Sequence, residues 1–271
     1  MTETQSHEPI IRVENLTMAY GAFVVQKNLT FSIDRGDIFV IMGGSGCGKS
    51  TLLRHLIGLQ PPAAGKVYYG AESLWDAEPR KRQAILRQVG VLYQSGALFT
   101  SMTLVENIAL PMQEYTNLDA RRIRAVASLK LALVGLAGYE DFFPSQISGG
   151  MMKRAGLARA MALDPKILFF DEPSAGLDPI SSKRLDDLIR QLRDDLGATI
   201  VMVTHELPSI FAIASNAVYL DNVKRTITAE GDPKDMVRES TEPVVRDFLT
   251  REGTFRETAT AGPAAAERIS G

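Results

Sequence analysis

Apolar and polar residues alternate along residues 10–20 and 29–33, as they do in strands that bury one face. Residues 38–42 are instead wholly apolar and include isoleucine and valine, which predicts a strand buried on both faces of a parallel sheet. Other segments that predict strands are residues 67–69, 89–93, 167–170, 199–203 and 217–220. Because these segments lie towards both ends of the chain, we expect the two ends to share a sheet.

Helical spacing replaces this alternation from residue 103 to about residue 162. Asp119 is a suitable N-cap for one helix there. The apolar face of that helix carries Ile123, Ala127, Leu131 and Val134. A shorter helix is expected at residues 49–58, ended by Pro61 and Pro62. Strands that alternate with helices predict an α/β fold with a mainly parallel sheet, interrupted by a helical insert at about residues 95–165.

Composition restricts the class of protein. The chain has 271 residues, of which 45% are hydrophobic, and a formal net charge of -2, so no basic field favours nucleic acid. The single cysteine cannot form an intrachain disulfide. The polar start does not resemble a signal peptide, and no apolar run approaches the ~20 residues of a membrane helix. If the protein acts at a membrane, we expect another subunit to span it.

The two ends of the chain differ from the rest. Residues 1–9 are polar, and residues 253–271 are rich in threonine, alanine and glycine, with little apolar surface to bury. We expect the start to be flexible and the tail to be disordered. The alternative for the tail is an arm that orders when it binds a partner.

A glycine-rich segment follows the apolar strand at 38–42 and opens a helix. It matches the pattern G-x-x-x-x-G-K-[ST] in full, in the strand-to-helix context that this motif requires. Backbone N–H groups and the helix N-terminus would surround phosphate oxygens. Lys49 would reach the β- and γ-phosphates, and Ser50 would coordinate Mg²⁺. The residues expected around a nucleotide are Gly43, Gly44, Ser45, Gly46, Cys47, Gly48, Lys49, Ser50 and Thr51. Because Cys47 lies inside this loop, alkylation of its thiol is expected to block ATP.

Two adjacent carboxylates end the strand at 167–170. Successive side chains of a strand point to opposite sides, so Asp171 and Glu172 can have different roles. Asp171 would hold Mg²⁺, and Glu172 would polarise the attacking water. Taken alone, the pair could simply cap the next helix; together with the glycine-rich loop it predicts phosphoryl chemistry.

Two further polar residues follow predicted strands. Gln94 comes after the strand at 89–93, and its amide could reach the metal or the water. His205 comes after the strand at 199–203, where it could contact the γ-phosphate. The alternatives are a polar strand end for Gln94 and a structural histidine for His205.

Ser148, Gly149 and Gly150 precede a helical stretch at 151–161. Ser148 could simply cap that helix. Because the glycines leave the helix N-terminus accessible, the same three residues could also form a second phosphate contact.

The order of these elements resembles the ABC ATPase family over residues 10–237. Residues 43–51 resemble its Walker A motif, Gln94 its Q-loop, residues 147–151 its signature and residues 167–172 its Walker B motif. Residues 175–178, ending in Asp178, resemble its D-loop, His205 its switch histidine, and Tyr20 the aromatic that stacks on adenine.

This resemblance implies the P-loop NTPase fold of ABC ATPase type, with an antiparallel β part beside the parallel sheet. The ATPase domain would span residues 10–252, with a RecA-like core at 10–94 and 165–240 and an α-helical subdomain at about 95–164. It also implies ATP hydrolysis with Mg²⁺ in a head-to-tail homodimer, in which Ser148 and Gly150 of one subunit close the ATP site of the other.

Within that family, residues 94–99 and the Ser-Gly-Gly-Met segment that ends in Met151 resemble the MlaF branch of phospholipid transporter ATPases. The usual signature has glutamine where Met151 stands. The branch implies an MlaE-like permease, an MlaD-like MCE-domain protein and an MlaB-like STAS-domain subunit, at the cytoplasmic face of the inner membrane. The permease would dock near residues 98–106. A transporter ATPase for another cargo is the alternative; a soluble ABC ATPase acting on nucleic acid or ribosomes fits less well, because the chain has one phosphate loop and no room for a coiled coil.

Overall fold

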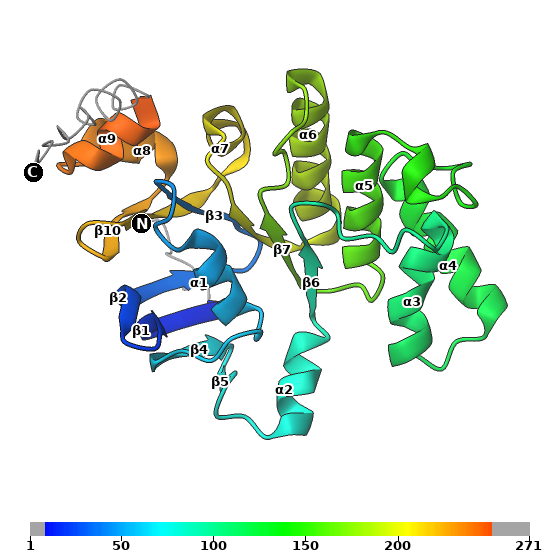
Figure 1. The fold of residues 1–271 in the computed structure, drawn as a ribbon, viewed down its shortest axis with the longest axis horizontal. Coiled ribbons are helices and arrows are strands. Elements are labelled where there is room, and N and C mark those ends of the chain that lie inside the picture. Colours follow the sequence, from blue (N-terminus) through cyan, green and yellow to red (C-terminus); the bar gives the residue numbers. More distant parts are fainter. Residues whose placement is uncertain (1–8, 251–271) are drawn as a thin grey trace, which may run out of the picture.

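A computed structural model describes residues 9–250, which form two sheets with helices around the larger one (Figure 1). The large sheet has the strand order β10-β9-β3-β8-β7-β6. Its strands are β3 (Ile38–Gly43), β6 (Val89–Leu92), β7 (Ile167–Asp171), β8 (Thr199–Val203), β9 (Asn216–Asp221) and β10 (Thr226–Gly231). All adjacent pairs are parallel except β9 and β10, which pair antiparallel. The predicted mainly parallel sheet, built from both ends of the chain, is confirmed.

The small sheet is antiparallel, with the order β2-β1-β4-β5. Its strands are β1 (Ile11–Tyr20), β2 (Phe23–Ile33), β4 (Ala64–Tyr69) and β5 (Glu72–Ser73). Strand β2 begins six residues before the predicted start at residue 29, because Phe23 and its successors pair with β1. The burial of residues 23–28 does not follow hydrophobicity, because the polar Gln26 is buried while Phe23 is exposed, so they carry no clear alternation.

Outside the insert, the described residues form six α-helices: α1 (Lys49–Leu56), α2 (Pro79–Leu86), α6 (Pro179–Leu196), α7 (Leu207–Ile213), α8 (Pro233–Glu239) and α9 (Pro243–Thr250). Helix α1 is two residues shorter than predicted. It stops before Gly58, whose φ of 76° is left-handed, rather than at the later prolines. The sequence patterns did not predict β5, β10, α2, α8 or α9.

The insert contains α3 (Leu104–Tyr115), α4 (Ala120–Leu133) and α5 (Gly149–Ala160), which lie together beyond β6 (Figure 1). Asp119 caps α4 by accepting a hydrogen bond from the Arg122 amide at 2.9 Å, as predicted. The predicted apolar face of this helix is buried. Thr103 and Glu106 form a capping box that begins α3.

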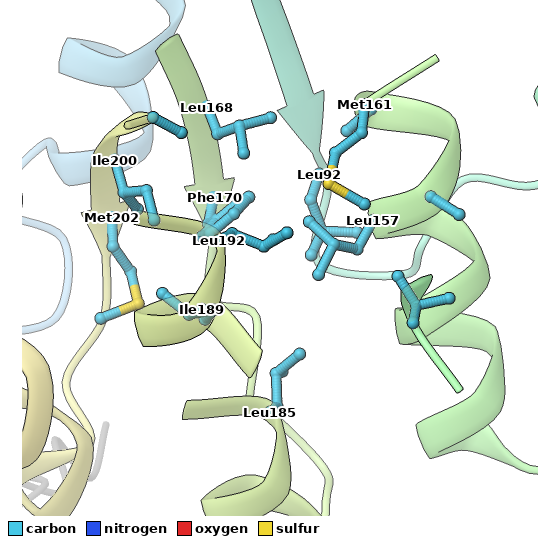
Figure 2. Packing of buried hydrophobic residues seen from close by; sticks show 14 of the residues in the cluster. Leu92, Leu157, Met161, Leu168, Phe170, Leu185, Ile189, Leu192, Ile200 and Met202 are labelled. Atoms are coloured by element: carbon cyan, nitrogen blue, oxygen red, sulfur yellow. The ribbon is translucent and has the colours of Figure 1, made fainter. Parts of the chain in front are cut away.

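Helix α5 joins the insert to the large sheet. Leu157 and Met161 point towards Leu92 of β6, and the same cluster continues to Phe170 of β7 and to α6 (Figure 2). A Cβ atom at Gly90 of β6 would lie 2.1 Å from the Ala160 carbonyl oxygen, so the two backbones touch. The position of α5 is therefore fixed by the sheet edge.

In residues 9–250 no helix is both long and apolar enough to cross a bilayer. The predictions for residues 1–8 and for the tail at 253–271 lie outside the described residues.

Candidate active site

The glycine-rich loop connects the buried strand β3 to α1, and its backbone requires glycine. A Cβ atom at Gly43, whose φ is 150°, would lie 2.5 Å from the Leu220 carbonyl oxygen. At Gly48, whose φ is 99°, it would lie 2.7 Å from Val25. No side chain caps α1, so its first amides face the loop. This arrangement provides the anion site that the sequence predicts.

Lys49 lies over this loop. Its Nζ donates to the carbonyl oxygens of Gly43 at 2.9 Å and of Gly44 at 3.0 Å. These contacts hold the ammonium group beside the amides of the α1 N-terminus. A bound anion would therefore meet a fixed cation and fixed N–H donors together.

The Cys47 side chain, unlike that of Lys49, is not directed towards the anion site. The residue is 1% exposed and belongs to the apolar cluster between the two sheets. Burial raises the pKa of the thiol. Cys47 therefore contributes backbone to the loop, and its side chain does not line the cavity described below. The structure offers alkylating reagents no direct access to this thiol.

The carboxylates of Asp171, the last residue of β7, and of Glu172, the next residue, have different partners. Asp171 Oδ1 accepts a hydrogen bond from the Ser50 hydroxyl at 3.2 Å. Glu172 Oε1 lies 2.8 Å from Nδ1 of His205. Asp171 and Glu172 point to different partners, as expected, but the alternation of side chains along a strand is not the reason. Glu172 lies after the end of β7 and has a left-handed φ of 48°, so a turn directs its side chain.

The backbone fixes this turn, because the Glu172 amide donates to the Val203 carbonyl oxygen of β8 at 2.9 Å. The Glu172 side chain is 12% exposed and that of His205 is 57% exposed. The second carboxylate oxygen of Glu172 is buried and has no hydrogen-bond partner in the described structure. A buried carboxylate oxygen of this kind can accept a hydrogen bond from a water molecule.

A cavity of about 1340 Å³ unites most of the predicted residues. It is lined by Tyr20, Gly43, Gly44, Ser45, Gly46, Gly48, Lys49, Ser50, Thr51, Gln94, Glu172 and His205. Asp171 reaches the site through Ser50. The phosphate loop, the two carboxylates, Gln94 and the histidine therefore belong to one site.

The cavity also has walls that the sequence did not predict. They are formed by Phe23, Val25, Glu206, Leu207, Tyr219, Val244, Asp247 and Phe248. The last three belong to α9, whose start after Glu242 and at Pro243 is a recognisable helix signal. That signal predicts a helix but not its place beside a loop two hundred residues earlier in the sequence.

Tyr20 lies at the rim, at the end of β1, and is 49% exposed. Its hydroxyl donates to Gln60 Oε1 at 3.2 Å. Hydrogen bonding to Thr51 lowers the pKa of the phenol. The ring is thus anchored at its polar end while its faces remain accessible for stacking.

Besides Cys47 and Asp171, four predicted residues do not line this cavity. Ser148 caps α5 by accepting from the Met151 amide at 3.3 Å, and Gly149 and Gly150 form the first turn. Asp178 caps α6 by accepting from the Ile180 and Ser181 amides, both at 3.0 Å. None of the four lines the cavity. A single chain therefore does not bring the signature segment to its own phosphate loop.

Comparison with known proteins identifies the family. The family model described as "ABC transporter" matches residues 26–175. The chain belongs to the ABC transporter family. The ATP-binding protein MlaF of the intermembrane phospholipid transport system of Haemophilus influenzae is 37% identical over 91% of this chain and 92% of its own length. Its counterpart in Escherichia coli K12 is 37% identical, with 90% of each chain covered. The sequence prediction of the family, and of similarity to the MlaF branch, is confirmed.

A second group of relatives carries a different name. The probable ribonucleotide transport ATP-binding protein mkl of Mycobacterium tuberculosis is 41% identical over 88% of this chain. The match spans 66% of that relative's length.

Solved structures confirm the fold. The ATP-binding cassette MJ0796, in a dimeric post-hydrolysis state with ADP and Pi, has a TM-score of 0.74 and 28% identity, covering 82% of this chain and 98% of that one. The protein cbiO1 from Clostridium perfringens, part of the ABC transporter complex cbiONQ, has a TM-score of 0.78 and 25% identity over 92% of this chain and 96% of that one.

Proposed function

We propose that this chain is the ATP-hydrolysing subunit of a transporter that moves phospholipid between the inner and outer membranes. The proposal of ATP hydrolysis depends on one observation: Glu172 Oε1 lies 2.8 Å from His205 Nδ1, in the same cavity as the phosphate loop. A carboxylate held by an imidazole beside an anion site is suited to activating a water molecule for attack on phosphate.

Nucleotide binding rests on the loop and the rim of the cavity. The amides of the α1 N-terminus and Lys49 would hold the β- and γ-phosphates. Tyr20 would stack on the base. Together these residues would place the terminal phosphate in the same cavity as Glu172 and His205.

The residues present fit a magnesium ion that is bound together with the nucleotide. Ser50 and Asp171 place a hydroxyl and a carboxylate 3.2 Å apart, and the Gln94 amide borders the same cavity. Mg²⁺ commonly uses one or two protein oxygens and completes its shell with water and phosphate. Within residues 9–250 no group of three or more His, Cys, Asp or Glu residues is placed to hold a metal ion by itself. The ion would neutralise charge on the phosphates.

During hydrolysis, Glu172 would accept a hydrogen bond from the attacking water and take up its proton. The water oxygen would bond to the γ-phosphorus as the bond to the bridging oxygen breaks, and that oxygen would leave with ADP. His205 would keep Glu172 Oε1 in place through Nδ1 and present its remaining ring edge to the γ-phosphate. The His205 side chain is 57% exposed, and its Nε2 lies 3.8 Å from Glu206 Oε1 at the same cavity. Chemistry would then require no covalent enzyme intermediate, only positioning and charge.

We further propose that hydrolysis takes place in a head-to-tail homodimer. Ser148, Gly149, Gly150 and Asp178 lie outside the cavity of their own chain, which supports a role at the site of a second copy. The exposed N-terminus of α5 would supply the second phosphate contact. In the dimer, each ATP would be held between the phosphate loop of one subunit and the signature of the other.

The phospholipid cargo is proposed from the MlaF relatives, which match this chain over 90% or more of both lengths. Transport of a ribonucleotide is the second candidate, because the mkl relatives are 41% identical. We favour phospholipid because the mkl match leaves a third of that protein without a counterpart. The proposed partners are an MlaE-like permease that docks near residues 98–106, an MlaD-like MCE protein and an MlaB-like STAS subunit. The chain would then lie at the cytoplasmic face of the inner membrane.

Affinity purification from membranes tests this assignment. We expect a permease and an MCE-domain protein to copurify with the chain, together with phospholipid. A permease for metals, amino acids or nucleotides in their place would refute the phospholipid assignment and leave the ATPase assignment intact.

A further inference from the structure

Lys153 of α5 connects two segments of the active site. Its side chain is buried, with the residue 7% exposed. Its Nζ donates to the Gln94 carbonyl oxygen, and it lies 3.4 Å from the Glu172 carbonyl oxygen. One ammonium group therefore bridges the backbone that follows β6 and the backbone that follows β7.

The same face of α5 holds the rest of the loop after β6. A Cβ atom at Gly156 would lie 2.9 Å from the Gly96 carbonyl oxygen, so helix and loop are in close contact. Arg159 Nη1 donates to the Ala97 carbonyl oxygen at 2.6 Å. Residues 153, 156 and 159 are spaced three apart and so lie on one side of the helix. This face binds residues 94–97 through their backbone, irrespective of their side chains.

The loop at residues 94–97, which α5 contacts, has an unfavourable backbone conformation. Gly96 and Ala97 have φ values of 75° and 51°, two left-handed residues in succession. Ala97 pays a steric cost in this region that glycine does not. The contact from Arg159 to the Ala97 carbonyl oxygen stabilises this conformation. The loop is therefore shaped by its attachment to α5.

Lys153 is held by carbonyl oxygens rather than by a direct ion pair. Within residues 9–250 no carboxylate lies within 4.0 Å of its ammonium group. Burial lowers the pKa of Lys153, while the charges of Glu172 and Asp171 act in the opposite direction. Because a buried ammonium must keep its hydrogen bonds, moving α5 would pull on both carbonyl groups.

We propose that Lys153 is a positioning residue that sets the backbone of Gln94 and Glu172 according to the position of α5. This inference rests on the proposed role of Glu172. Helix α5 begins at Ser148, the residue proposed to serve the ATP site of a second copy. A chain would contact the ATP of a second copy through Ser148 and act on its own ATP through Glu172. Lys153 links these two roles, because it lies on α5 and contacts the backbone of Glu172.

The chain offers a matched control at the next position. Arg154 of α5 donates from Nη1 to two carbonyl oxygens, of Val134 at 3.0 Å and Gly135 at 3.2 Å. Burial lowers the pKa of Arg154 also. Its hydrogen bonds stay inside the helical insert. Lys153→Met and Arg154→Met therefore remove similar interactions, but only the first reaches Gln94 and Glu172.

The test compares steady-state ATP hydrolysis of full-length Lys153→Met, Lys153→Gln, Lys153→Arg and Arg154→Met proteins. We expect Lys153→Met to lower kcat about tenfold or more, with the KM for ATP within about threefold, because the phosphate loop is untouched. Lys153→Arg, which can still donate to both carbonyl groups, should stay within about threefold of the wild-type kcat. Arg154→Met should keep kcat within about threefold, even where its Tm falls.

Amide hydrogen exchange supplies a readout that is independent of turnover. The Gly96 amide donates to the Tyr93 carbonyl oxygen at 2.8 Å and reports on the loop at residues 94–97. We expect its exchange to accelerate in Lys153→Met and to stay unchanged in Arg154→Met. If Lys153→Met does not fold, Lys153→Gln takes its place in both measurements, because its uncharged side chain is one bond shorter than lysine and cannot donate to both carbonyl groups.

Three results would overturn the proposal: wild-type kcat and Gly96 exchange in Lys153→Met or Lys153→Gln, an equal loss of kcat in Arg154→Met, or a failure of Lys153→Arg to restore kcat. A failure of the proposed catalytic role of Glu172 would give a different experimental result. Normal turnover by Glu172→Gln would remove Glu172 from catalysis, whereas the exchange measurement would still report whether Lys153 holds the loop.

Discussion

Glu172 and His205 meet because their strands are neighbours. Asp171, at the end of β7, pairs in register with Val203, at the end of β8. The residues that follow the two parallel strands therefore emerge at the same edge of the sheet, where Glu172 Oε1 lies 2.8 Å from His205 Nδ1. The phosphate loop follows β3, the next strand of the same sheet.

Replacing His205 by alanine tests this contact. The change leaves the Glu172 carboxylate without its partner and removes the proposed γ-phosphate contact. We expect kcat for ATP to fall by about ten- to a hundredfold, with a smaller change in KM, in steady-state phosphate release. An unchanged kcat would show that the imidazole does not position the carboxylate.

Lys49 should control nucleotide affinity. Lys49→Ala removes the cation that lies over the phosphate loop, so we expect ATP affinity to fall by about a hundredfold in a calorimetric titration. Lys66→Ala is the control, because Lys66 is exposed and pairs with Asp76 at 2.7 Å on the small sheet. Equal affinities for the two variants would contradict the assigned phosphate contact.

Cys47 should react slowly with thiol reagents in the native protein. The thiol is buried and its pKa is raised by that burial, so both its accessibility and its thiolate fraction are low. Mass spectrometry after maleimide treatment should show labelling in urea and little in its absence. Rapid labelling of the native protein would place the thiol in the cavity, as the position of Cys47 in the sequence predicts.

Asp186 should make stability depend on pH. It is buried beneath α7 and accepts a hydrogen bond from Ser209 at 2.8 Å. Burial raises its pKa, so the folded state binds a proton more tightly than the unfolded state does, and stability falls as pH rises from the ordinary pKa through the raised one.

Asp186→Asn keeps the acceptor for Ser209 and removes the charge. We expect its Tm to exceed that of the wild type by about 2 °C near neutral pH, and the difference to shrink as pH falls towards the ordinary aspartate pKa. A difference in Tm that is independent of pH would show that Asp186 carries no shifted charge.

The parts of the fold that were predicted have local causes. Residues 38–42 are apolar because β3 is buried on both faces, and Asp119 caps α4 through an amide three residues away. The glycine-rich loop could also be predicted from local sequence, because Gly43 and Gly48 have backbone conformations that exclude other residues. Each of these signals lies within a few residues of the structure that it specifies.

The parts that were missed depend on contacts between distant segments. Phe248 lines the cavity only because the fold brings α9 to the same cavity as the phosphate loop, about two hundred residues earlier in the sequence. The direction of Glu172 follows from a left-handed turn held by Val203, and that of Cys47 from packing between two sheets. Lys153 reads as one more charged residue on a helix, and only the tertiary structure buries it against Gln94. No local pattern encodes these relationships.

The central claim is that Glu172 activates water for ATP hydrolysis in a site that binds ATP without it. Phosphate release and ATP binding by purified Glu172→Gln protein, beside wild type and with Mg²⁺, test this most directly. We predict a loss of turnover of about a hundredfold or more, with ATP affinity retained and a closed dimer that persists. Turnover at the wild-type rate, or no ATP binding by either protein, would contradict the account.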